Sequence, residues 1–497
     1  MRSGWNRLAR RTHSAVAAIA SGVLISACSA APTAAPATAP PAAAPTTPPV
    51  AAKPTQPPAA ATQPTAAAAP AKPAQAQPTS ASSYTGPSVE LTFTNFYTGP
   101  DLAIIESMLK QFNTDHPNIV VKNNAIAGDT QISELPQLVA AGKASDVEAH
   151  HDFGFPQLAP RGVFVELTPD LLSTMGITSD QYFPNIWDLG TVSNKVYGVP
   201  FGATAAVTYY NKTLMQKMGV SAVPTNRDEL LTAGKSCTTD AAGKHPGDAG
   251  FDANNLDTYG VGIPITFGSL IGAGVLKSSG GSLWDSTYNV AFNSPQATDT
   301  LQFLSDLSAK YSIAPAKVGW EADIANFRAG KSCFALTGAW ELKGNQDTQG
   351  LDFGVARFPR LGTAQDAAWG GAAWLTLPKQ PNSYDKNKRA AAIEFVKWMT
   401  SRAGSLAWTQ SGNLPARPDV ANSPEYASNP MVETAKKLDG LYIPSGFPWI
   451  GQVNDGWNNA FNSVMIGTKT PGDALAANAA EAQKNVEQAK PNYPNFP

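Results

Sequence analysis

Cysteine, charge and long apolar runs are all scarce in this sequence of 497 residues. Only 15% of the residues are charged, and the formal net charge is −2 at pH 7. Nucleic acids and acidic membranes attract strongly basic patches, so this charge balance favours neither as a partner. After residue 25 no apolar run approaches the ~20 residues that a transmembrane helix needs. The sequence therefore predicts no nucleic-acid partner and no integral membrane body.

Catalytic signatures are also missing. The motifs Gly-x-Ser-x-Gly and His-Glu-x-x-His do not occur, and no glycine-rich loop with Lys and Ser/Thr is present to cradle a phosphate. Paired carboxylates for glycoside cleavage are close in space and have no fixed sequence spacing, so that enzyme class stays open. We expect that the protein is not an enzyme.

The chain begins with a segment that is typical of an export signal. Four arginines precede an apolar run from Ala15 to Ile25, which is short for a membrane span but suits a signal-peptide core. Small residues then lead to Cys28, a pattern that resembles a bacterial lipoprotein signal. The resemblance implies cleavage before Cys28, a diacylated thiol and a folded body held at the outer face of the cytoplasmic membrane. The sequence does not distinguish export through the general secretory route from export through the twin-arginine route. An incidental cysteine in an ordinary cleaved signal peptide is the alternative to lipidation at Cys28.

Residues 29–87 consist almost entirely of Ala, Pro and Thr. Such a segment has too little apolar surface to offset the entropy of ordering, and its prolines favour extended conformations. We predict a disordered, semi-rigid tether. About 410 residues remain, from Val89 to Pro497. A chain of this length usually exceeds what one hydrophobic core holds, so we predict two lobes.

The first part of the body alternates strands and helices. Residues 89–96 alternate apolar and polar side chains, residues 102–112 repeat apolar side chains at helical spacing, and a second strand (118–122) and helix (131–141) follow. This order predicts a parallel sheet with crossover helices. Because ligands bind beyond the carboxyl ends of such strands, Tyr97 and Asp129 are candidate ligand-binding residues.

His150, His151 and Asp152 leave the next predicted strand together. Adjacent residues of a strand point to opposite faces, so the two histidines cannot easily ligate one ion, and we expect no metal. Hydrogen bonding to a ligand hydroxyl is the better interpretation, with Asp152 as the acceptor.

The segment from Phe327 to Trp340 reads as a helix end, a Gly-Lys turn, a short buried strand and a bend. Gly330 suits a helix C-cap, and residues 333–336 are too short for a helix. Gly338 lets the chain turn and places Trp340 just past the strand. On these residues alone, Trp340 is either a core side chain or a stacking platform for a ligand.

This segment resembles a motif of extracellular solute-binding proteins (family 1 type) of carbohydrate ABC importers. Further resemblances follow the family's order: a Tyr-Gly-x-Pro segment (197–200), a Gly-Gly turn (280–281), a Gly-Gly strand (368–378) and a Gly-x-x-Pro turn (412–415). The chain departs from the family at Asn226, where a Trp is frequent. The preceding Thr225, with Asp228 three residues later, predicts a capped helix start.

The resemblance implies an α/β, two-lobe periplasmic-binding-protein-like fold with a hinge and an inter-lobe ligand cleft. The first lobe would hold residues 89–200 and about 366–415, and the second lobe residues 201–365 and about 416–497. The first crossing between the lobes would lie at 200–204.

The implied function is capture of a sugar or oligosaccharide by a monomer and its delivery to the permease subunits of an ABC importer, with no cofactor. The candidate ligand-binding residues are Tyr97, Asp129, Asp152, Phe201, Trp284, Trp340 and Trp369. A polyol, a glycerophosphate or a polyamine is an alternative solute, although no basic cluster favours a phosphate. An anchored glycan-processing enzyme and an adhesion protein are alternatives from other classes.

Cys237 and Cys333 are the two cysteines of the body. In an oxidising compartment a disulfide between them is plausible, and two separate buried thiols are the alternative, because a sequence does not give the Cα separation.

Overall fold

The computed structural model describes residues 84–126, 130–494 and 496, all within one compact unit formed by residues 75–497. The predicted lipidation site Cys28, the tether up to residue 83, and Asp129 lie outside the described residues. Among the described residues, no helix combines the length and the apolarity that a membrane crossing requires.

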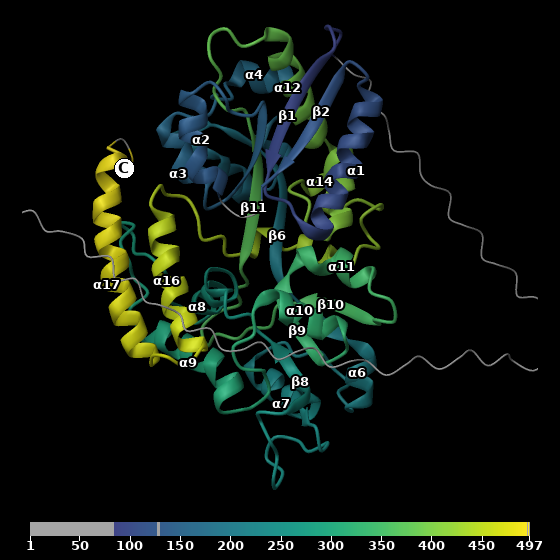
Figure 1. Cartoon of the computed structure of the whole chain (residues 1–497), viewed down its shortest axis with the longest axis vertical. Coiled ribbons are helices and arrows are strands. Elements are labelled where there is room, and N and C mark those ends of the chain that lie inside the picture. The colour runs from purple at the N-terminus through teal and green to yellow at the C-terminus, as the bar shows by residue number, and fades with distance from the viewer. Residues whose placement is uncertain (1–83, 127–129, 495, 497) are drawn as a thin grey trace, which may run out of the picture. The chain divides into compact units, whose positions relative to one another are not determined.

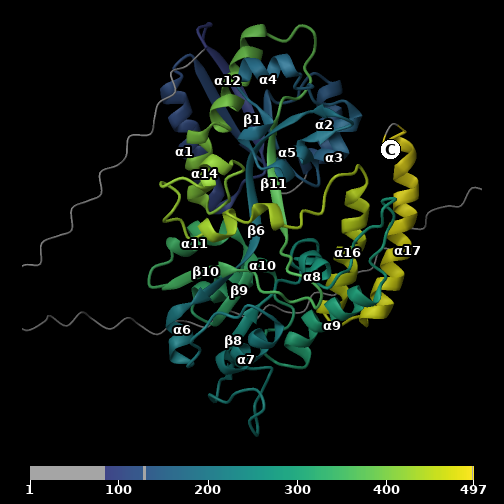
Figure 2. The ribbon, with the colours of Figure 1, turned by 180° about the vertical axis from the view of Figure 1, so that it is seen from behind.

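The body consists of two α/β lobes joined by long strands, as Figures 1 and 2 show from opposite sides. A nine-stranded sheet runs through both lobes in the order β2-β1-β3-β11-β6-β9-β8-β7, with β10 paired to β6. The elements up to residue 192 are β1 (Val89–Asn95), α1 (Gly99–Asp115), β2 (Ile119–Ala125), α2 (Thr130–Ala140), β3 (Val147–His151), α3 (Phe155–Leu158), α4 (Pro169–Met175), α5 (Pro184–Trp187) and β4 (Thr191–Val192).

The middle of the chain passes into the second lobe and returns. Its elements are β5 (Lys195–Val196), β6 (Gly198–Asn211), α6 (Lys212–Lys217), α7 (Arg227–Cys237), β7 (Thr239–Asp240), β8 (Leu256–Gly262), α8 (Ala273–Ser278), α9 (Pro295–Ala309), α10 (Trp320–Arg328), β9 (Ser332–Gly338), α11 (Leu342–Gln346), β10 (Phe353–Arg357) and β11 (Gly370–Thr376). The last part holds α12 (Lys386–Met399), α13 (Arg402–Trp408), α14 (Pro418–Ala421), α15 (Val432–Ala435), α16 (Ile450–Met465) and α17 (Pro471–Ala489).

The predicted parallel sheet of the first lobe is confirmed. Strand β1 pairs in parallel with both β2 and β3. Helix α1 begins with Pro100 in its first turn, where a fixed φ suits a helix, and then buries Ile105, Leu109 and Phe112 on one face. Phe112 and Phe93 both contact Phe395 of α12 in edge-on geometry. These side chains form the centre of the first core.

A second core lies in the other lobe, where α9, α16 and α17 pack together beside α8. Helix α9 begins at Ser294, whose side chain accepts a hydrogen bond from the Ala297 amide, and it buries Leu301 and Leu304. Trp457 of α16 packs against Phe292 in the same core. This lobe therefore has its own hydrophobic centre.

A disulfide joins Cys237, the last residue of α7, to Cys333 in β9. Their Cα atoms lie 6.1 Å apart, and both residues are fully buried in the second core. The sequence left open a disulfide or two separate buried thiols, and the structure has the disulfide.

One strand carries the chain from lobe to lobe. Strand β6 pairs with β11 through Ala205 and with β9 from Ala206 onward. We predicted this crossing at residues 200–204, and the change of partner comes immediately after that segment. Trp369 belongs to the second core, and β11, which begins at the next residue, pairs with β3 of the first lobe.

We predicted the last crossing between the lobes at about residue 416. Ala421, Tyr426, Met431 and Leu438 belong to the first core, whereas the second core resumes at Phe447. The segment after the Gly-x-x-Pro turn at 412–415 contacts both lobes: α14 packs on α13 of the first lobe, and α15 on β10, which pairs with β6 in the second lobe.

The start of α7 also differs by one residue from prediction. Asn226, not Thr225, is the N-cap, and its side chain accepts a hydrogen bond from the Glu229 amide at 3.0 Å. Thr225 instead donates to the Glu229 carboxylate. Asn is as good a cap as Thr, which explains the shift.

Candidate functional site

Trp340 is placed by the backbone that precedes it. The C-cap of α10 is Ala329, and Gly330, which we predicted as the cap, follows it with φ of +74°. Every residue of β9 is buried. A Cβ on Gly338 would lie 2.0 Å from the Trp340 ring. Only glycine therefore lets this indole fold back over the end of the strand.

A layer of polar contacts holds the short 3₁₀ turn that carries Trp340 (Ala339–Glu341). Glu341 is buried and accepts hydrogen bonds from Arg328 Nη2 at 2.7 Å and from Trp320 Nε1 at 2.8 Å. Arg328 also donates from Nε to the Asn345 side chain. These bonds tie the turn to α10 and α11, so the indole is carried by a rigid support.

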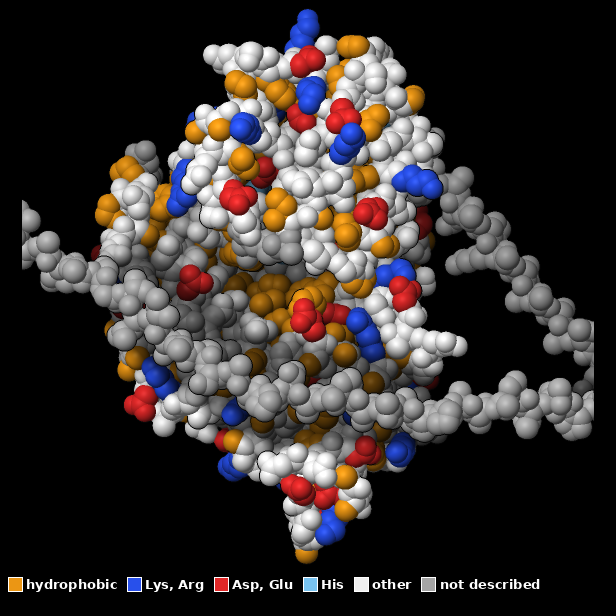
Figure 3. All heavy atoms as spheres, in the orientation of Figure 1, with side chains coloured by type: hydrophobic (Ala, Val, Ile, Leu, Met, Phe, Trp, Pro, Cys, Tyr) orange, Lys and Arg blue, Asp and Glu red, His pale blue; other side chains and the backbone are white. Residues whose placement is uncertain are grey.

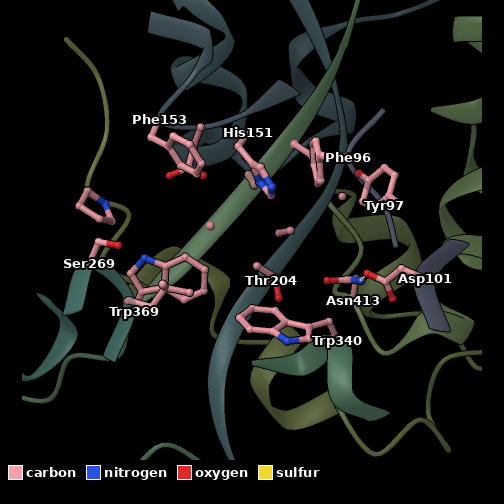
Figure 4. A pocket seen from close by; sticks show the side chains of 18 of the residues that line it. Phe96, Tyr97, Asp101, His151, Phe153, Thr204, Ser269, Trp340, Trp369 and Asn413 are labelled. Carbon is pink, nitrogen blue, oxygen red and sulfur yellow. Dashed lines mark hydrogen bonds between the residues drawn. The ribbon is translucent and has the colours of Figure 1, made fainter. Parts of the chain in front are cut away.

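The ends of β1 and β3 contribute side chains that face this indole. Phe96 and Tyr97 follow β1, Asp101 lies in the first turn of α1, and His151 and Asp152 mark the end of β3. They enclose, together with second-lobe residues, a cavity of about 290 Å³. Figure 4 shows the first-lobe side chains on one side of it and Trp340 and Trp369 on the other.

Small residues of the connecting strands form the floor of the cavity. Gly202, Ala203 and Thr204 of β6 and residues 371–373 of β11 all line it. A Cβ on Gly202 would lie 2.4 Å from the Trp408 ring, so glycine is needed for that close approach. Figure 3 shows hydrophobic side chains gathered in a hollow midway along this face of the body.

Aromatic rings dominate the walls. Trp340 and Trp369 meet edge to face, with centroids 6.1 Å apart and planes at 82°. Opposite them, His151 stacks between Phe96, at 3.5 Å, and Phe153, at 5.1 Å. Flat apolar faces on both sides suit a ligand with apolar C–H surfaces.

Four residues that line the cavity carry a buried polar atom without a hydrogen-bond partner: Tyr97 Oη, Asp101 Oδ1, Thr204 Oγ1 and Asn454 Oδ1. Buried polar groups in native proteins are nearly always paired, so these residues are candidates for hydrogen bonds to a ligand.

Burial sets the charge state of the site. It raises the pKa of the Asp101 carboxyl from 3.8 to about 7, against the lowering effect of the Asn413 hydrogen bond. Burial also lowers the pKa of His151 to about 3, so this imidazole is neutral at pH 7. No Lys or Arg is among the described residues that line the cavity.

Residues 107–434, more than half of the chain, match the bacterial extracellular solute-binding proteins. The chain belongs to this family. A binding protein of Brucella abortus is 23% identical over 418 residues, covering 81% of this chain and 94% of that protein. The mannitol-binding protein of Pseudomonas aeruginosa is 22% identical over 424 residues, covering 79% and 92% of the two chains.

Solved structures share the two-lobe fold. The ABC substrate-binding protein Lmo0181 from Listeria monocytogenes, in complex with cycloalternan, superposes with a TM-score of 0.68 at 22% identity. The superposition covers 80% of this chain and 99% of the Listeria chain. The predicted fold class, with a ligand cleft between two α/β lobes, is confirmed.

Four of the predicted ligand-binding residues line the cavity of this solute-binding protein: Tyr97, Asp152, Trp340 and Trp369. Asp152 is buried, and its amide donates to the Ala372 carbonyl at 3.0 Å. This bond links the end of β3 to the floor strand β11.

Two predicted residues do not line it. Phe201 is buried in the first core, where its ring packs against Tyr97 and Trp408 at a bulge of β6. Trp284 packs against Phe447 and Tyr442 at the margin of the second core. Trp284 follows the Gly-Gly turn at 280–281 and packs over the edge of the second core.

Asp101, His151, Thr204 and Asn413 also line the cavity, although the sequence analysis did not choose them as ligand-binding residues. Asp101 and Asn413 are 312 residues apart, yet Asn413 Nδ2 donates to Asp101 Oδ2 at 3.1 Å. Asn413 lies in the Gly-x-x-Pro turn that the sequence did mark. A signal for Asp101 was available in the sequence. It is an acidic residue in the first turn of the helix that follows the candidate loop after β1.

The raised pKa of Asp101 predicts a measurable linkage between pH and stability. A carboxyl that titrates near 7 in the fold and near 3.8 when unfolded stabilises the fold below pH 4, and this contribution is lost as pH rises through 7. From pH 5 to pH 8, the wild type should therefore lose about 1–3 kcal/mol of unfolding free energy relative to Asp101→Asn. Urea unfolding of the unliganded proteins measures this.

Both proteins contain His151, whose lowered pKa makes the fold more stable as pH rises. Comparing the two proteins cancels this contribution and those of the other groups that they share. Asp170→Asn is the matched control, because Asp170 also follows a proline at a helix start but is exposed. A constant difference between wild type and Asp101→Asn across this range would show that the Asp101 carboxyl is not destabilised when ionised.

Proposed function

We propose that this protein captures a sugar or oligosaccharide between its lobes and delivers it to the permease subunits of an ABC importer. The observation that carries the proposal is the cavity itself, where Trp340 and Trp369 face a first-lobe wall with the unpaired Tyr97 Oη, over a floor with the unpaired Thr204 Oγ1. A sugar ring offers apolar C–H faces for the indoles and hydroxyl groups for the unpaired atoms.

Binding between the lobes gives a means of signalling. A ligand that touches both walls makes more contacts when the lobes close, so it shifts the population toward the closed form. In our proposal the permease recognises that form, and no catalytic step takes place.

The relatives support a solute rich in hydroxyl groups. The Pseudomonas relative is named for mannitol, and the Listeria structure contains cycloalternan. A phosphate-bearing solute such as a glycerophosphate fits less well, because the described cavity lining has no Lys or Arg to bind the anion.

We further propose that the protein acts as a lipid-anchored monomer at the outer face of the cytoplasmic membrane. The proposed anchor is a diacylated Cys28, and the Ala/Pro/Thr-rich residues 29–87 would hold the body away from it. Metabolic labelling with a radioactive fatty acid, compared between wild type and Cys28→Ser, tests the anchor. Equal labelling of the two proteins would contradict it.

A thermal-shift screen against mono-, di- and oligosaccharides tests the solute class. A solute present at 100 times its dissociation constant should stabilise the folded state by about 2.7 kcal/mol and raise Tm by several degrees. Simple amines, polyols and organic phosphates are screened in parallel. The carbohydrate assignment fails if no saccharide raises Tm while one of these other classes does.

A further inference from the structure

Trp320, the first residue of α10, is the one tryptophan in the described part of the chain that is exposed to solvent. It is 36% exposed, whereas Trp284 and Trp340 are half-buried and the tryptophans of both cores are buried. An indole has one of the largest apolar surfaces of any side chain, so leaving it in water forgoes the free energy that burial would supply. Trp320 does not line the cavity between the lobes, so the site described above makes no use of its ring.

The exposed ring is held in one orientation. Its Nε1 donates to Glu341 Oε1 at 2.8 Å, and the buried Glu341 also accepts from Arg328 Nη2 at 2.7 Å. A hydrogen bond to a carboxylate is charge-assisted and therefore strong. A ring that is already fixed loses little conformational freedom when a ligand packs on it, which favours binding. Trp320 thus has the properties of a preformed platform.

A row of aromatic rings connects Trp320 with the cavity. The centroid of the Phe267 ring lies 6.2 Å from that of Trp320 and 6.2 Å from that of Trp340. Trp340 in turn meets Trp369, and both of these indoles line the cavity. Phe267 itself is buried and directly precedes the π-helical turn Gly268–Gly272, which also contributes to the cavity lining. Trp320 therefore lies at the outer end of a row that begins inside the cavity.

The position of α10 suits a ligand that extends out of the cavity. Figure 1 draws α10 at the level where the two lobes meet, and Figure 3, in the same orientation, shows the hydrophobic hollow close to that level. The two centroid distances through Phe267 set an upper limit to the separation of the Trp340 and Trp320 rings. A chain of a few sugar rings covers such a span.

We propose that Trp320 is an outer stacking platform and that the solute is an oligosaccharide reaching from the Trp340–Trp369 pair to Trp320. The inference rests on the proposed function and narrows it, because a monosaccharide held in the cavity leaves Trp320 bare. A sugar ring that packs its C–H face on this indole removes apolar surface of both partners from water. The hydroxyl groups of this outer sugar stay in solvent, so the platform selects for chain length.

Calorimetric titration with saccharides of increasing length tests the proposal. The probes are the malto-, cello- and manno-oligosaccharides, each series running from the monosaccharide through the hexasaccharide. In a series that binds, wild-type affinity should rise with chain length and then level off. The last step before the plateau should contribute about 5- to 20-fold, as expected for one stacked indole.

Trp320→Gln is the decisive variant, because it removes the ring and keeps an N–H donor for Glu341. Affinity for the shortest member that binds should stay within about twofold of wild type, since that sugar is held at the cavity alone, and the last rise should disappear. Trp320→Tyr, which keeps a ring and a donor, should restore most of that rise. Trp284→Gln changes a second-lobe tryptophan outside the cavity and should leave the whole series unchanged. Circular dichroism of each variant establishes that it is folded.

The outcomes separate the two proposals. A last rise that is lost in Trp320→Gln and returns in Trp320→Tyr supports this inference. Wild-type affinity that does not depend on chain length, or a rise that survives in Trp320→Gln, overturns it and leaves the sugar-binding function intact. An equal loss at every chain length in Trp320→Gln also overturns it, because Trp320 would then act only by holding Glu341 and the turn of Trp340. If no saccharide of any length binds, both proposals fail.

Discussion

Replacing Trp340 with Ala is expected to weaken binding of the solute about 100-fold, while the unliganded protein loses less than about 2 kcal/mol of unfolding free energy. The indole is only half-buried in the unliganded fold, and it lines the cavity beside Trp369. Aromatic side chains in such positions dominate binding energy, whereas large losses of stability follow from truncating fully buried rings. Calorimetric titration with the solute found in the thermal-shift screen, and urea unfolding, measure the two effects.

Trp284→Ala is the matched control for this prediction. Trp284 is also a half-buried tryptophan of the second lobe, but it contacts Phe447 and Tyr442 and lies outside the cavity. It should lose stability and keep its affinity for the solute. The opposite pattern, with a large loss of stability in Trp340→Ala and unchanged affinity, would make Trp340 a core residue.

The fold of this protein follows largely from local patterns. Alternation in residues 89–96 and helical spacing after residue 102 predicted β1 and α1, and the turn signals around Gly330 and Gly338 predicted β9. Each of these signals is short in range, because it depends on the period of one element and on the residue that ends it.

The composition of the cavity depends on contacts that are long in range. Asp101 meets Asn413 only because the chain returns to the first lobe after residue 369. Which face of β6 is exposed is likewise decided by its neighbours, and this choice buries Phe201 and leaves Thr204 at the cavity. A sequence pattern could predict that β6 crosses between the lobes without indicating which of its faces meets the solute.

The region of the last crossing depends on packing in the same way. After the turn at 412–415, α14 packs on α13 of the first lobe and α15 on β10 of the second. Short helices such as α14 and α15 have no strong periodicity of their own, so only packing assigns them to a lobe. Boundaries between lobes are therefore less predictable than the elements on either side.

Breaking the Cys237–Cys333 bond should lower the free energy of unfolding by about 4–5 kcal/mol, because the bond closes a long loop in the unfolded chain. The two residues are 96 positions apart, and the bond ties α7 to the strand β9 that leads to Trp340. Urea unfolding with and without a thiol reductant measures the loss, and a mass increase of two hydrogens confirms reduction.

The Cys237→Ala, Cys333→Ala double variant separates the bond from the reductant, since it should unfold at the same lower urea concentration in both conditions. Its affinity for the solute should stay within about threefold of wild type, because Trp340 is also held by the hydrogen bonds of Glu341 to Arg328 and Trp320. A loss of affinity that exceeds this, in a variant still folded by circular dichroism, would mean that the bond itself sets the position of the indole. Unchanged stability on reduction would contradict the expected entropic role of the bond.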